Sequence, residues 1–128
     1  MIIRINGAEV PAANPAAFKG AELTDVSVWK YGVSLGFNDA PMAITIEGGA
    51  EIKANGKSET YDAQGGTALG ARLLEQLGRK VTSVAFENTS KLFVVVFDNG
   101  TELALRPNTA SGYETYQINM PDGSMLVG

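Results

Sequence analysis

Residues 80–118 read KVTSVAFENTSKLFVVVFDNGTELALRPNTASGYETYQI, and this stretch decides the fold. Alternation of apolar with polar or small residues over 82–86 predicts a half-buried strand. Residues 92–97 form an uninterrupted apolar run, which is typical of a strand buried on both faces. Asn99-Gly100 predicts a type I′ hairpin turn into a further strand at 101–105. The stretch therefore indicates a meander of antiparallel strands.

The same alternation recurs on both sides of this stretch, separated by turns rich in Asn, Asp, Gly and Pro. Asn6-Gly7 and Asn55-Gly56 are the clearest of these turns, and one helical turn is expected after Pro15. The remaining strands are expected at residues 1–5, 22–29, 33–37, 44–47, 51–54, 58–61, 113–120 and 125–127.

One segment, at about residues 67–77, has helical periodicity. Thr67 is expected to be its N-cap, and Gly78 lies just past its end. Apolar and small residues recur at i, i+3, i+4 and i+7, which predicts a stripe on one face of the helix. The stripe consists of Gly70, Leu73, Leu74 and Leu77. We interpret it as core packing rather than as a surface for a partner.

Residues 20–62 and 78–120 are interpreted as two copies of one supersecondary unit. GAELTDVSV at 20–28 aligns with GRKVTSVAF at 78–86, with Gly, Thr and Val in common. Self-similarity of this kind is typical of a duplicated unit. A single meander cannot bury its apolar face, whereas two copies can pack against each other.

The expected fold is α+β and mainly antiparallel β, in a single domain spanning residues 1–128. Two duplicated β-meander halves form a sandwich or an open barrel, with the helix of about 67–77 between them. Because the second half's run at 92–97 is apolar on both faces, we expect the helix to cover its extra face.

Composition excludes several kinds of chemistry. The 128 residues contain no cysteine and no histidine, so disulfides, thiolate nucleophiles and Ser-His or Cys-His catalysis are excluded. Fourteen acidic and ten basic residues give a net charge of −4, which argues against nucleic acid as a partner. No apolar run is long enough for a membrane span. We expect a cytoplasmic protein with no membrane partner, no metal and no cofactor.

Three segments resemble a family of small bacterial proteins known only as a domain of unknown function. They are Leu77-Gly-Arg-Lys-Val-Thr-Ser-Val84, Phe97-Asp-Asn-Gly-Thr101 and Tyr113-Glu-Thr-Tyr-Gln-Ile118, which follow the family's order LGRxVTxV, FDDG, YESxxI. The resemblance covers the chain from about residue 20 onward. Asn99 and Thr115 stand where the family has Asp and Ser. The resemblance implies a bacterial protein, and it implies no activity and no catalytic residue.

A few aromatic residues are the best candidates for a recognition surface, because Tyr and Trp concentrate binding energy at interfaces. The predicted partner-binding residues are Trp29, Tyr31, Tyr113, Glu114 and Tyr116. On the strand at 113–120, alternation places at least one tyrosine at the surface or in a groove.

Size, acidity and the lack of nucleophiles favour a non-catalytic cytoplasmic protein-binding module. Its most concrete form is an immunity or antidote protein that occludes a basic toxin domain. The alternative is a small-ligand carrier with a cavity between the two β halves, lined by Phe86, Phe93, Phe97 and Tyr116. An enzyme that uses carboxylates alone is ranked last. A homodimer formed through a sheet edge is compatible with all three.

Overall fold

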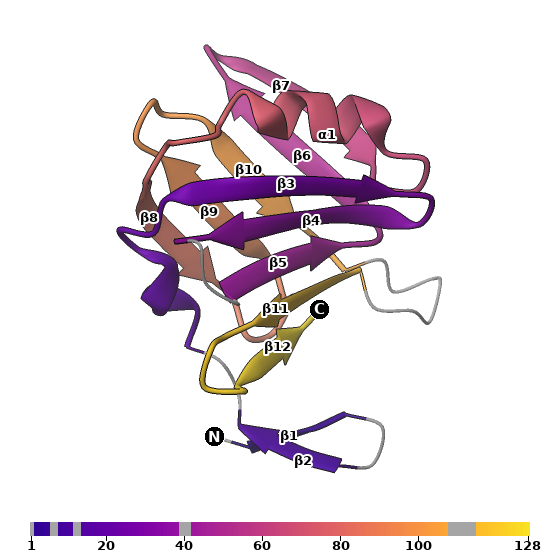
Figure 1. Cartoon of the computed structure of the whole chain (residues 1–128), viewed down its shortest axis with the longest axis vertical. Helices are drawn as coiled ribbons and strands as arrows, with labels where there is room; N and C mark the ends of the chain where they lie inside the picture. The colour runs from indigo at the N-terminus through magenta and orange to yellow at the C-terminus, as the bar shows by residue number, and fades with distance from the viewer. Residues whose placement is uncertain (1, 6–7, 12–13, 39–41, 108–114) are drawn as a thin grey trace.

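Two antiparallel five-stranded sheets carry the fold of the computed structural model, which describes residues 2–5, 8–11, 14–38, 42–107 and 115–128 (Figure 1). The first sheet contains, in spatial order, β12 (Met125–Val127), β11 (Tyr116–Asn119), β5 (Met42–Ile46), β4 (Gly32–Phe37) and β3 (Leu23–Trp29). The second contains β7 (Lys57–Asp62), β6 (Gly49–Ala54), β10 (Glu102–Leu105), β9 (Phe93–Phe97) and β8 (Val81–Phe86).

The predicted α+β, mainly antiparallel β fold is confirmed, and the two sheets are open rather than closed into a barrel. Each sheet combines three consecutive strands with a hairpin from elsewhere in the chain. The hairpin β6–β7 leaves the meander β3–β4–β5 and pairs with β10, whereas β11–β12 leaves β8–β9–β10 and pairs with β5. Because each sheet contains a hairpin from the other half of the chain, the two sheets are linked more firmly than two separate meanders would be.

The sheets also meet at one corner, where β3 and β8 begin. The N–H of Val81 donates to the carbonyl of Ala21 at 2.8 Å, and the N–H of Leu23 donates to the carbonyl of Arg79 at 2.9 Å. Backbone N–H and carbonyl groups at the ends of β3 and β8 would otherwise lack hydrogen-bond partners, and each sheet supplies them for the other.

Gly20 and Gly78 precede β3 and β8 in the same conformation, with φ of 87° and 83°. Their N–H groups donate to the carbonyls of Val81 and Leu23 at 2.7 and 2.8 Å. A positive φ favours glycine, since it has no Cβ to clash with the backbone. The segments aligned in the sequence therefore enter their strands in the same way, while the internal repeat stays a prediction about how the chain arose.

The core lies between the inner faces of the two sheets. The helical turn expected after Pro15 is a 3₁₀ helix, η1 (Pro15–Phe18), and it inserts Phe18 into this core. The Phe18 ring meets Phe37 of the first sheet edge-on, with centroids 5.1 Å apart, and Phe93 of the second at 6.3 Å. Phe18 thus links both sheets through two buried aromatic contacts.

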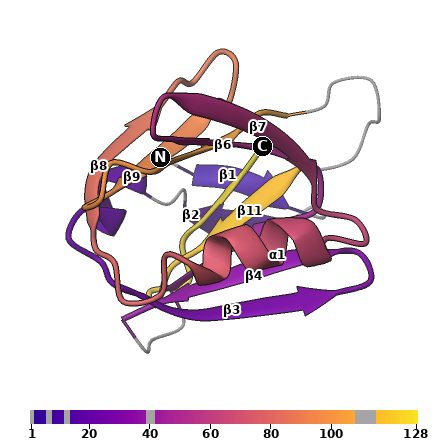
Figure 2. The ribbon, with the colours of Figure 1, turned by 90° about the horizontal axis from the view of Figure 1, so that it is seen from above.

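The helix α1 (Thr67–Leu74) closes the open side of the sandwich between β3 and β7 (Figure 2). It is shorter than predicted, and its N-cap is Gly66, with no side-chain capping hydrogen bond, rather than Thr67. The predicted cover of residues 92–97 by the helix is wrong, because α1 packs against β3 and β7 and the outward-facing Val94 and Val96 remain half-buried.

Two predicted Asn-Gly turns differ in type. At Asn55-Gly56 both residues have positive φ, 53° and 76°, as a type I′ turn requires. At Asn99-Gly100 only Gly100 does, with φ of 85°, so the predicted type I′ turn is wrong there. The N–H of Gly100 donates to the carbonyl of Phe97, and the N–H of Phe97 donates to the carbonyl of Thr101. This pattern is that of a longer hairpin loop whose last residue is a glycine in the left-handed conformation.

The N-terminal segment forms its own two-stranded antiparallel sheet from β1 (Ile2–Ile5) and β2 (Ala8–Pro11). The predicted Asn6-Gly7 turn between them lies outside the described residues. Across the described part of the chain, no helix has the length and apolar character needed to cross a membrane.

Replacing Phe93 with alanine tests the aromatic link between the sheets. Phe93 is fully buried, so we expect Phe93→Ala to lower the free energy of unfolding by about 3–5 kcal/mol. Urea denaturation followed by circular dichroism measures the loss. Val94→Ala is the control on the opposite face of the same strand, and we expect a loss of about 1 kcal/mol or less. Equal losses at the two positions would contradict the assignment of faces.

Candidate functional site

The hairpin between β3 and β4 carries two of the predicted contact residues. Trp29 ends β3 with 38% of its surface exposed, and Tyr31 lies in the turn with 56% exposed. The ammonium of Lys30 lies 5.3 Å from the centre of the Tyr31 ring, within the range of a cation–π contact. The structure therefore brings Trp29 and Tyr31 together at one accessible end of the first sheet.

Trp29 lies across the outer face of this sheet. A Cβ built on Gly32, its cross-strand partner, would be only 3.0 and 3.2 Å from Cζ2 and Cη2 of the indole. The indole ring thus occupies the space that a side chain at position 32 would need. A Cβ at position 32 would also clash with the carbonyl oxygen of Ile46, so the missing side chain accommodates both the backbone of β5 and the indole.

The other predicted contact residues do not join this pair. Tyr113 and Glu114 lie outside the described residues. Tyr116 is a core residue with 1% exposure, and its ring stacks on Phe93 with centroids 5.9 Å apart. Its hydroxyl donates to the carbonyl of Lys91 at 2.5 Å. The prediction of Tyr116 as a partner contact is corrected, because strand alternation turns it inward opposite Ile46.

An apolar strip along α1 and β3 was missed in the sequence. Leu74 and Leu77 are 49% and 45% exposed, so the predicted buried stripe is only half right. The buried side chains are Leu69, Leu73 and Gln76, which follow i, i+4 and i+7, so the face that meets the core is centred one residue before the predicted stripe. Leu74 and Leu77 lie on the neighbouring face, which is half-exposed.

Strand β3 extends this strip. The N–H of Gly65 donates to Lys30 at 3.0 Å and the N–H of Gly78 donates to Leu23 at 2.8 Å, so the segment containing α1 runs antiparallel beside the strand. Val28, which is 43% exposed, packs against the backbone of Gly70 on the helix. We define the α1–β3 strip as Val26, Val28, Leu74 and Leu77.

A signal for the strip was present in the sequence. Gly70 has no side chain, which allows Val28 of β3 to approach the helix backbone. A glycine at this position therefore indicated the side of the helix that lies against the edge strand. The hydrophobic pattern alone could not separate these two environments.

Several of the described carboxylates lie at turns and strand ends. Asp62 accepts a hydrogen bond from the N–H of Gln64, and Asp98 lies 3.6 Å from the Arg79 guanidinium. The hydroxyl and N–H of Ser124 hydrogen-bond to Asp122 and hold the pKa of that carboxyl below its usual value. No group of three potential metal-ligating side chains occurs among the described residues.

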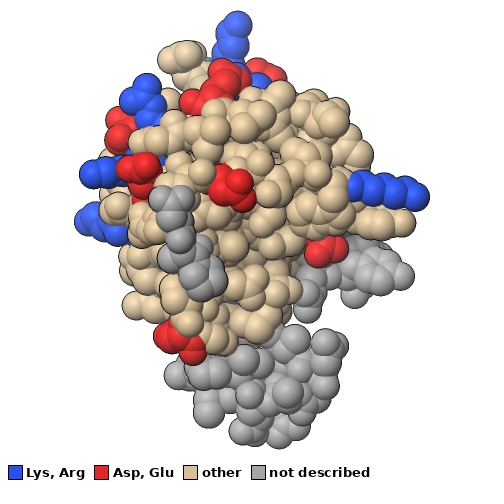
Figure 3. All heavy atoms as spheres, viewed as in Figure 1, with Lys and Arg blue, Asp and Glu red and all other residues tan. Residues whose placement is uncertain are grey.

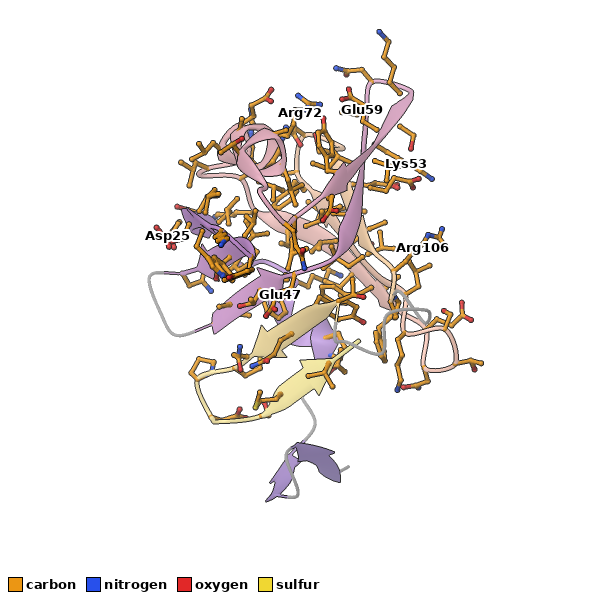
Figure 4. The ribbon with its side chains drawn as sticks, turned by 90° about the vertical axis from the view of Figure 1, so that its right-hand side faces the viewer. Asp25, Glu47, Lys53, Glu59, Arg72 and Arg106 are labelled. Atoms are coloured by element: carbon orange, nitrogen blue, oxygen red, sulfur yellow. The ribbon has the colours of Figure 1, made fainter. Side chains whose placement is uncertain are left out.

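Charged groups of the two sheets point away from each other. In Figure 4, Lys53, Glu59 and Arg106 lie on the side of the second sheet, and Asp25 lies on the opposite side. The ion pair between Arg72 and Glu75, at 2.6 Å, flanks the α1–β3 strip.

The residues proposed to line a carrier cavity instead fill the space between the sheets. Phe93, Phe97 and Tyr116 are buried, and Phe86 is half-buried beneath the Lys91 ammonium, 5.7 Å from its ring. A shallow depression of about 180 Å³ lies elsewhere, at β6, β7 and β10 of the second sheet. Its lining residues are Gly49, Ala50, Glu51, Thr60, Ala104 and Arg106.

No protein-family model, no curated protein and no solved structure matches this chain. The resemblance to a bacterial domain of unknown function therefore stays a prediction, and the candidate site depends on the geometry alone.

The buried hydroxyl of Tyr116 makes stability depend on alkaline pH. Burial raises the pKa of this group above its ordinary value of 10.0. The unfolded chain then loses the proton first, so the contribution is intact below about pH 10 and declines above it. We expect Tyr116→Phe to cost about 1 kcal/mol at neutral pH and to flatten the fall in the free energy of unfolding above pH 10.

Urea denaturation of the wild type and of Tyr116→Phe across the alkaline range measures both effects. Tyr31→Phe is the matched control, since Tyr31 is mostly exposed and its removal is expected to leave the pH profile unchanged. If the free energy of unfolding fell equally with pH in the wild type and in Tyr116→Phe, the pH dependence could not be assigned to the Tyr116 hydroxyl.

Proposed function

We propose that the chain is a non-catalytic protein-binding module whose recognition surface is the α1–β3 strip. One observation carries the proposal: the exposed large hydrophobic side chains of the described residues all lie on β3, the β3–β4 turn, α1 and the turn that follows it. These residues are Val28, Trp29, Tyr31, Leu74 and Leu77, of which Val28, Leu74 and Leu77 belong to the strip. Contiguous exposed apolar surface marks interaction sites more often than scattered single residues do.

The geometry of the strip supports a protein partner. Its residues come from a helix and an adjacent edge strand that are held together at both ends by backbone hydrogen bonds, so the surface is pre-organised. Leu and Val offer no hydrogen-bonding groups, and an apolar face on the partner suits them best. Arg72 Nη1 and Glu75 on α1 form an ion pair, so the two charges on this helix offset each other.

The immunity or antidote form of this proposal requires a partner with a basic surface. Among the described residues, the carboxylates nearest the strip are paired or dispersed, which favours an apolar contact over an electrostatic one. A toxin remains one candidate partner. We propose that it would bind to the α1–β3 strip and not to a cluster of acidic residues. The carrier alternative has less support, because aromatic side chains occupy the interior.

Capture from the native lysate, followed by reconstitution with the purified partner, tests the proposal. We expect the double variant Leu74→Gln, Leu77→Gln to weaken binding by about tenfold or more, which corresponds to about 1.4 kcal/mol. Both side chains are half-exposed, so the change in the free energy of unfolding is expected to stay within about 0.5 kcal/mol for each. Titration calorimetry measures the affinity.

The matched control is Val94→Gln, an equal change of polarity at a half-buried position on the outer face of the second sheet. We expect it to bind as the wild type does. Equal retention of the partner by the strip variant and the wild type, or retention of no protein by either, would overturn the proposal.

A further inference from the structure

The outer face of the first sheet has a composition unlike that of the second. Cross-strand pairing places one row of side chains across all five strands: Ser27, Ser34, Thr45, Gln117 and Val127. The neighbouring row is Asp25, Gly36, Ala43, Asn119 and Met125. Each row is about 19 Å long at a strand spacing of about 4.8 Å. We call these two rows, with Trp29 over Gly32, the polar face.

Small residues lie in the middle of the polar face. Gly32, Gly36 and Ala43 carry little or no side chain, and the six-membered ring of Trp29 comes close to the first of them. Trp29 remains 38% exposed. An exposed aromatic ring beside small side chains leaves room for a ligand to reach it.

Hydrogen-bonding groups stand along the same face. The Ser34 and Thr45 hydroxyls are half-exposed and have no hydrogen-bond partner within the described part of the chain. The Gln117 amide donates to Asn119 at 3.0 Å, which leaves its carbonyl oxygen and a second N–H available. Hydroxyl and amide groups offer donors and acceptors in alternation and carry no net charge.

The charges of the two rows do not favour an anionic ligand. The rows contain one charged residue, Asp25, whose carboxylate accepts a hydrogen bond from Ser27 at 3.2 Å. Figure 3 shows the face from the front, with basic side chains at its margins and an acidic side chain near its middle. A phosphate backbone would find no cation in these two rows to replace its counterions, and Lys30, next to Trp29 in the sequence, lies over the Tyr31 ring.

The second sheet provides an internal contrast. Cross-strand pairing over its five strands places Ala85, Val94, Ala104, Glu51 and Thr60 in one row, and Ser83, Val96, Glu102, Lys53 and Ser58 in the next. Both faces therefore carry hydroxyls, but the rows of the second sheet hold three charged residues and no amide or glycine. The first sheet differs in its lower charge, its amides and glycines, and Trp29.

We propose that the polar face binds a neutral carbohydrate chain, with Trp29 as the stacking surface for one sugar ring. A sugar ring has an apolar C–H face that suits an aromatic plane, and its hydroxyls donate and accept as the Ser, Thr and amide groups require. A linear chain of several sugars matches the length of the rows. This site lies apart from Leu74 and Leu77, so it does not depend on the proposed function.

Trp29 is the single tryptophan of the chain, so its fluorescence reports on this face alone. The probes are soluble neutral polysaccharides, namely α- and β-linked glucans, mannan, galactan and xylan, with single-stranded DNA as an anionic comparison. Native gels cast with each polysaccharide measure retardation, and tryptophan emission measures contact with the indole. We expect retardation and a shift in emission with at least one polysaccharide and no response to the DNA.

Variants then assign the binding to the polar face. We expect Trp29→Ala to weaken binding by about tenfold or more, and Thr45→Val with Gln117→Leu to weaken it severalfold while leaving the tryptophan in place. Leu74→Gln, Leu77→Gln is the control and is expected to bind the polysaccharide as the wild type does. Circular dichroism checks that each variant is folded.

Four outcomes would overturn the inference. The first is no retardation and no change in emission with any polysaccharide of the panel. The second is retardation that persists in both the Trp29 and the Thr45/Gln117 variants. The third is a response to single-stranded DNA alone, which would assign the face to nucleic acid. Loss of binding in the Leu74/Leu77 variant only would assign the polysaccharide to the strip instead.

Discussion

The structure depends on the corner where β3 and β8 cross-link the two sheets. Glu22 and Lys80 form an antiparallel bridge there, and backbone hydrogen bonds on both sides of it run in each direction between the sheets. Backbone groups at such a corner must be paired with each other or with water, and pairing them with each other fixes the relative orientation of the sheets. The glycines at positions 20 and 78 make the approach possible, because each adopts a left-handed conformation.

Both candidate surfaces follow from this corner. Gly78 ends the helical segment and hydrogen-bonds to the first residue of β3, so the helix is held along the edge of the first sheet rather than over the centre of the second. Leu74 and Leu77 thereby remain half-exposed next to Val28. Because the helix closes the side of the sandwich, it leaves the outer face of the first sheet open, and Trp29 lies on that face.

Sequence patterns recovered the elements better than the surfaces. Period-2 alternation located most strands, and Pro15 marked the start of a short helix. The errors at Leu74 and Leu77 arose because the buried face of the helical segment includes the polar Gln76, so the neighbouring face with two leucines had the more apolar pattern. Tyr116 was placed at a possible surface because alternation shows that two faces exist and not which one is buried. The polar face was not predicted, since it is formed by residues of five strands that are far apart in the sequence.

By itself the sequence determined the class of fold, the position of its helix and the absence of cysteine and histidine chemistry, because these depend on local periodicity and composition. Only the tertiary structure decided which hairpin joins which sheet, which side of α1 is covered and which aromatic residues reach the surface. Those outcomes depend on pairing between distant segments, such as β6 with β10 and β5 with β11, where many registers satisfy the same local pattern. Burial of the shared core around Phe18 selects among them.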